Sequence, residues 1–145
     1  MSHGAAPLSA SVQLAPAIDG VRLSLHVLAA AVWVGGQITL AGLVPTARGL
    51  GDGATAALAR AFARIQWPAY VVLVGTGIWN VAAVGNPRPS AWQAVLSVKI
   101  AVVALAGLAA FLHTRSRGRA AVAAWGAVAA VSSLAALVMG VFLAG

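Results

Sequence analysis

The chain has 145 residues, of which 61% are hydrophobic and 8% are charged, and it contains no cysteine. About a quarter of the residues in a soluble domain carry charge, so this composition excludes an ordinary soluble protein. The lack of cysteine excludes disulfides, iron–sulfur clusters and thiolate metal sites. The formal net charge is +7. Because the basic residues flank apolar segments, we interpret this charge as a membrane-topology signal and expect no nucleic-acid partner.

Four apolar segments are long enough to cross a lipid bilayer. They cover residues 18–44, 66–84, 91–114 and 120–143. The sequence therefore predicts an all-α fold, a polytopic membrane four-helix bundle with up-down-up-down connectivity, in a bacterial-type inner (plasma) membrane. Residues 1–17 are expected to form a flexible leader, and residues 18–145 a single transmembrane domain. Within the leader, His3 is a candidate Cu(II) ligand together with the amino terminus.

The first segment carries three unusual side chains, His26, Trp33 and Gln37. At about 100° per helical residue, Trp33 and Gln37 lie roughly 20° to either side of His26, so the three share one face. A histidine in a membrane-spanning helix indicates a functional site, because a buried polar ring costs free energy unless it has a partner. We expect this face to point into the bundle.

The opposite face of the same helix is a ridge of small residues, which lets another helix approach closely. The ridge comprises Ala31, Gly35, Thr39 and Gly42. If His26 points inward, the ridge contacts a neighbouring helix or a second protomer, so one expectation is a homodimer through these four residues. In the alternative, the ridge is buried and His26 lies near the headgroups.

Proline and arginine positions predict the helix ends and the orientation. Pro45 is expected to end the first helix, and Trp67-Pro68 to kink or restart the second. Six arginines follow the first and third segments, namely Arg48, Arg60, Arg64, Arg115, Arg117 and Arg119, whereas Arg22 and Arg88 are on the other side. The positive-inside rule then makes the six-arginine side cytoplasmic and predicts an N-out/C-out topology.

Depth in the membrane brings several polar residues to one level, since each helical residue adds about 1.5 Å. His26 and Lys99 lie at similar distances from the outer ends of their segments, and Asn80 and Met139 lie slightly nearer to theirs. We therefore expect these four side chains to form a site in the outer leaflet. His113 is about 21 Å from Lys99 along the same helix. It is not expected to share a metal or a haem with His26, and we expect it to anchor at the headgroups.

The chemistry of this level leaves three interpretations open. Lys99 either extends to the interface or pairs with an anionic ligand, because the only acids, Asp19 and Asp52, are not deep. A haem needs an axial histidine, here His26 with Met139 as a second ligand, and a cation for a propionate. A copper site with His26 and Met139 as ligands is the second interpretation. The third is a structural or assembly subunit.

Several short patterns resemble a known family. His26-x6-Trp33-x-Gly35-Gly36, the arginine-to-proline stretch 60–68, Gly75-Thr76-Gly77 and the stretch 92–99 resemble the CopD-like copper-resistance membrane domain. This resemblance implies copper handling or homeostasis through a His26-centred site in the outer leaflet, which is the first function that we expect. The related HemJ-type protoporphyrinogen oxidases have a first-helix histidine and a third-helix lysine that match His26 and Lys99, which implies haem b and a membrane oxidoreductase. The expected cofactor-binding residues are His26, Lys99, Trp33, Asn80 and Gln37, and the expected metal ligands are His26 and Met139.

Overall fold

The computed structural model describes residues 16–51, 53–85 and 88–144. This part of the chain is helical throughout and contains no strand. The first helix consists of α1 (Ala17–Ala30), a π-helical turn η1 (Ala31–Gly35) and α2 (Gly36–Gly49), and it is followed by α3 (Ala54–Ala83), α4 (Ser90–Arg115) and α5 (Arg119–Ala144). The prediction of an all-α protein with four long helices is confirmed.

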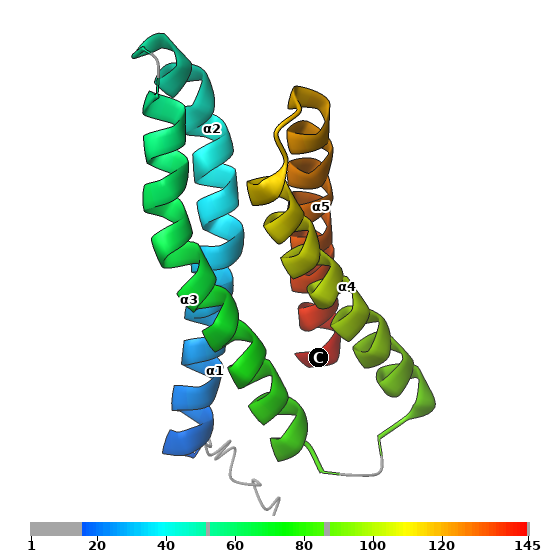
Figure 1. Cartoon of the computed structure of the whole chain (residues 1–145). Coiled ribbons are helices and arrows are strands. Elements are labelled where there is room, and N and C mark those ends of the chain that lie inside the picture. The colour runs from blue at the N-terminus through cyan, green and yellow to red at the C-terminus, as the bar shows by residue number, and fades with distance from the viewer. Residues whose placement is uncertain (1–15, 52, 86–87, 145) are drawn as a thin grey trace, which may run out of the picture.

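The helices form two antiparallel hairpins (Figure 1). The continuous α1–η1–α2 helix packs along α3, and α4 packs along α5. The turns between α2 and α3 and between α4 and α5 lie at one end of the molecule. The start of α1, the α3–α4 connection and the end of α5 lie toward the other, which we call the lower end as drawn in Figure 1.

The prediction that Pro45 ends the first helix was wrong, and the second helix does not restart at Pro68. Pro45 lies inside α2, which continues to Gly49, and Pro68 lies inside α3, which runs unbroken from Ala54. A proline removes one backbone hydrogen bond, but in apolar surroundings a helix is still better satisfied than irregular backbone. The reversal after α2 occurs instead at Gly51 and Gly53, whose φ angles of 109° and 91° suit glycine.

Three of these helices are long and apolar enough to cross a membrane: the joined helix Ala17–Gly49, Ser90–Arg115 and Arg119–Ala144. This composition is that of a multi-pass membrane protein. Although α3 has 30 residues, it is not among the three. Its first half contains Arg60 and Arg64, and its second half contains Thr76 and Asn80. The fourth crossing therefore stays a prediction.

Trp33 lies at the centre of the core and is 2% exposed. Its ring centroid is 4.5 Å from that of Tyr70 and 6.0 Å from that of Trp67, both on α3. Its indole Nε1 donates a 2.8 Å hydrogen bond to Ser133 Oγ on α5. Trp33 thus joins the two hairpins, and the expected inward direction of its helix face is confirmed.

The second hairpin packs through small side chains, which let the two backbones approach closely. The buried residues are Ala106, Gly107, Ala109 and Ala110 on α4, and Ala129, Ser132, Ser133 and Ala136 on α5. Tyr70 of the first hairpin also lies against α4: its hydroxyl donates to Val103 O at 2.9 Å and touches Gly107 so closely that a Cβ there would overlap it.

The small-residue ridge of the first helix faces away from the other helices. Ala31, Thr39 and Gly42 are exposed, and a Cβ added at Gly35 or Gly42 would meet nothing within 4 Å. The alternative in which this ridge is buried inside the chain is therefore excluded. The homodimer stays a prediction.

Candidate functional site

His26 is held by a hydrogen bond across the first hairpin. Its Nδ1 lies 2.8 Å from Thr76 Oγ1 on α3. The Thr76 hydroxyl itself lies 2.7 Å from the carbonyl oxygen of Val72, one turn earlier, and 3.2 Å from that of Leu73. A hydroxyl has a single proton, so Thr76 donates to its own helix and accepts the proton of His26 Nδ1.

This arrangement fixes the chemistry of the imidazole. With Nδ1 donating to Thr76, the neutral ring has its lone pair on Nε2, which is the atom that can bind a metal ion. A ligating histidine is ordinarily oriented by such a hydrogen bond from its other nitrogen. The ring is half-buried, and its Cε1 would lie 3.5 Å from a Cβ added at Gly77. Thr76 was not predicted as part of the site.

Lys99 and His26 lie at the same level, since each is nine positions inside its helix, about 13 Å from the lower end. Lys99 is half-buried, and its Nζ lies 3.0 Å from the position of a Cβ on Gly140 of α5. Within the described part of the chain, no carboxylate pairs with this ammonium group.

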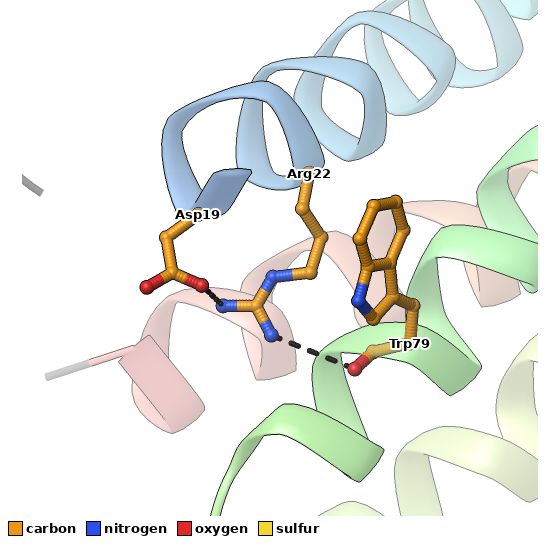
Figure 2. Close-up of polar contacts among 3 residues, drawn as sticks. All are labelled: Asp19, Arg22 and Trp79. Carbon is orange, nitrogen blue, oxygen red and sulfur yellow. Dashed lines mark hydrogen bonds and ion pairs between the residues drawn. The ribbon is translucent and has the colours of Figure 1, made fainter. Parts of the chain in front are cut away.

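Arg22 is a second residue of the site, besides Thr76, that was not predicted from the sequence. It was counted as a loop charge, but it lies in α1, is 8% exposed and points toward α3 (Figure 2). Its Nη2 lies 3.0 Å from Asp19 Oδ1, and its Nη1 lies 3.5 Å from the carbonyl oxygen of Trp79. A signal was present, because a residue four positions before His26 shares its helix face.

Two buried polar atoms near this end have no hydrogen-bond partner among the described residues. They are Arg22 Nε and Asn80 Oδ1. In folded proteins nearly all buried polar groups are paired, so unpaired ones indicate a bound ion, water or ligand. Asn80 is four residues after Thr76 on α3, as Arg22 is four before His26 on α1. The antiparallel helices therefore place both about 6 Å nearer the lower end than the His26–Thr76 pair.

Trp33 and Gln37 lie deeper and have a different partner. Both donate to Ser133 Oγ, at 2.8 Å from Trp33 Nε1 and 3.2 Å from Gln37 Nε2. The structure therefore brings these two residues together with α5, while His26 contacts α3. Met139 is half-buried on α5, next to the Gly140 against which Lys99 lies.

The other two histidines do not contribute to this site among the described residues. His113 Nδ1 lies 2.7 Å from the carbonyl oxygen of Val122, and its ring packs on Gly126, so this histidine ties α4 to α5. His3 lies outside the described residues. In the ranges that the structure describes, no group of three or more histidine, aspartate or glutamate side chains is arranged to hold a metal ion.

The site therefore consists of a single oriented imidazole and two cationic side chains, with Arg22 on its lower side and Lys99 at its level. Comparison with known protein families, curated proteins and solved structures finds no match to this chain.

Proposed function

We propose that the chain is a haem b-binding membrane protein, with His26 as an axial ligand through Nε2 and Lys99 as the partner of a propionate. The observation that carries this proposal is the hydrogen bond that His26 Nδ1 donates to Thr76 Oγ1, which leaves Nε2 as the free nitrogen. The remaining support comes from the charge and shape of the surroundings.

The charges around His26 favour an anionic ligand. Arg22 and Lys99 are two cations at this end, and Asp19 is the only described carboxylate that pairs with either. An ammonium group in apolar surroundings is costly without an opposite charge. A ligand that combines a metal ion with carboxylates meets the needs of His26 and Lys99 together.

Two glycines lie next to Thr76 on α3. Gly75 and Gly77 flank Thr76, so α3 presents no bulky side chain on either side of the residue that holds the imidazole. A Cβ at Gly75 would meet nothing within 4 Å. The donor set fits a porphyrin, and Gly75 leaves part of the α3 surface uncovered, while the His26 ring lies over Gly77.

A copper centre finds less support among the described residues. Copper sites in proteins draw several histidine, cysteine or methionine ligands together. Here the chain has no cysteine, and the second described histidine, His113, is engaged at the other end of α4. Conduction of an ion along the bundle axis is also disfavoured, because Trp33, Trp67 and Tyr70 fill the centre. Copper handling stays an expectation of the resemblance.

In this proposal each residue has a defined task. Bound haem b supplies a one-electron iron couple. Thr76 keeps the His26 ring in one tautomer and orientation, and Lys99 neutralises a carboxylate. The cluster of Trp33, Tyr70 and Trp67 closes the site off from the other end of the bundle. With six arginines beyond that cluster, we place the site on the outer side of an inner membrane.

The test is the absorption spectrum and metal content of the protein purified in detergent. The wild type is expected to show a Soret band and about one iron per chain, and His26→Ala is expected to lose both. His113→Ala is the matched control, since it removes a histidine at the opposite end and should keep the band. A colourless protein whose copper depends on His26 supports copper handling instead. A protein without either cofactor leaves the structural role.

A further inference from the structure

We infer that Arg22 is a second carboxylate-binding group of this site, in exchange with Asp19, and that the site selects ligands with two carboxylates. This inference rests on the proposed function and extends it. It assigns a role to the most buried charged side chain of the described residues.

Arg22 has the attributes of a binding group. Its guanidinium lies between α1 and α3, with Asp19 on one side and the Trp79 carbonyl on the other (Figure 2). Its Nε is buried and unpaired, and the contact with Trp79 O is long at 3.5 Å. A guanidinium binds carboxylates through two parallel N–H groups, so an unpaired Nε is a donor available for such a pair.

The ammonium group of Lys99 reaches the same level as Arg22. Trp92 Nε1 donates to Leu143 O at 3.3 Å, which fixes the register of α4 against α5 near the lower end. Lys99 is seven residues from Trp92, but the Gly140 that its Nζ touches is only three from Leu143. The ammonium therefore lies about 6 Å nearer the lower end than its own Cα, and Arg22 lies about 6 Å nearer than His26.

The positions of His26, Arg22 and Lys99 together fit one shape of ligand. The metal-binding nitrogen of His26 is deeper, and two cations from opposite hairpins, Arg22 and Lys99, lie about one helical turn nearer the membrane surface. A planar ligand with a central metal and two carboxylates on one edge matches this arrangement. A ligand with one carboxylate would leave Lys99 unpaired, or would leave Arg22 with Asp19 as its carboxylate partner.

Asp19 is a carboxylate that a ligand can displace. The Asp19 side chain is 38% exposed, while that of Arg22 is 10% exposed. An ion pair with a solvated partner contributes little free energy, because the carboxylate is stabilised by water when it leaves. Exchange of the Asp19 carboxylate for a ligand carboxylate keeps the charge of Arg22 neutralised throughout.

The experiment compares iron protoporphyrin IX with its dimethyl ester, titrated by Soret absorbance into the full chain in detergent. The wild type should bind the free acid at least tenfold more tightly than the ester. Arg22→Gln should weaken binding of the acid about tenfold and leave the ester unchanged, since it removes a charge-assisted hydrogen bond. Arg22→Lys should restore part of the preference, and Asp19→Asn should tighten acid binding several-fold by removing the competing carboxylate.

Metal-free protoporphyrin IX, followed by its fluorescence, separates this inference from the proposed function. An Arg22-dependent preference for the free acid that survives in His26→Ala would uphold the inference, because this probe has no metal to ligate. Axial ligation by His26 is refuted separately if iron protoporphyrin IX binds His26→Ala with the affinity and Soret position of the wild type. Equal loss of acid and ester binding in Arg22→Gln would assign Arg22 a structural role and overturn the inference. It is also overturned if neither porphyrin shows an Arg22-dependent preference for the acid, or if Asp19→Asn weakens binding. Circular dichroism of each variant confirms that the helices are retained.

Discussion

Polar side chains in the middle of the bundle are hydrogen-bonded, whereas several at the lower end have no partner among the described residues. In the middle, Trp33 and Gln37 both donate to Ser133, and the Tyr70 hydroxyl donates to Val103 O. At the lower end, Arg22 Nε and Asn80 Oδ1 are buried without partners, and Lys99 has no carboxylate among the described residues. Paired polar groups in a membrane protein hold helices together, whereas unpaired ones indicate ligand binding. Variants of the two regions should therefore change different observables.

The largest effect on stability is expected from Trp33→Ala. It removes the 2% exposed side chain that joins the two hairpins and should lower the free energy of unfolding by about 3–5 kcal/mol. Unfolding in mixed micelles, followed by circular dichroism, measures this loss. Trp79→Ala is the control, because that side chain is 41% exposed. Equal destabilisation by both variants would contradict the central role of Trp33.

A smaller loss is expected where the second hairpin meets Tyr70. In Gly107→Ala the new Cβ overlaps the Tyr70 hydroxyl, so Tyr70 must move and its bond to Val103 O is lost. Overpacking of this kind costs about 1–3 kcal/mol of unfolding free energy. Gly20→Ala is the matched control in α1, since a Cβ there meets nothing within 4 Å and alanine favours the helix. The same unfolding assay should show opposite signs for the two substitutions.

Substitutions at the lower end should change the affinity for the ligand instead of the free energy of unfolding. Thr76→Val keeps the shape of the side chain but removes the hydroxyl that accepts from His26 Nδ1. Loss of a group that orients a metal ligand lowers affinity about 10–100-fold, while the unfolding free energy should change by less than about 1 kcal/mol. Haem titration of Thr76→Val beside Thr76→Ser, which keeps the hydroxyl, measures the difference. Wild-type affinity in Thr76→Val would show that the His26–Thr76 bond only joins helices.

Sequence periodicity predicted the helices and the inward face of the first helix, but not which helices that face bonds to. The apolar lengths give the helices, and the 100° spacing gives the inward face of His26, Trp33 and Gln37. The π-helical turn η1 has no distinct composition, and across it the hydrogen-bond partners of this face change from α3 to α5. The helix through Pro45 was missed because the cost of a proline depends on whether the alternative backbone can be hydrated.

Residue counts predicted the depth of the site residues in the membrane, but not which side chains they contact. The depths of His26 and Lys99 follow from residue counts alone. The pairing of His26 with Thr76 depends on the register between α1 and α3, which the turn at Gly51 and Gly53 sets and which no pattern in one helix encodes. Arg22 was missed because a charge near a helix end was assumed to be solvated. Its spacing from His26 and Asp19 already placed it on the inward face.

The smallest effect should come from Gln37→Leu, and it tests whether the middle region is only structural. Gln37 shares Ser133 Oγ with Trp33, so its removal leaves Ser133 paired and costs one hydrogen bond between helices, about 0.6 kcal/mol. A double-mutant cycle with Ser133→Ala isolates that bond, because Trp33 loses its acceptor only in the serine variant. Haem affinity should be unchanged in Gln37→Leu. If affinity falls while stability holds, Gln37 contacts the ligand, and the boundary between the paired middle and the ligand-binding lower end must be moved toward α2.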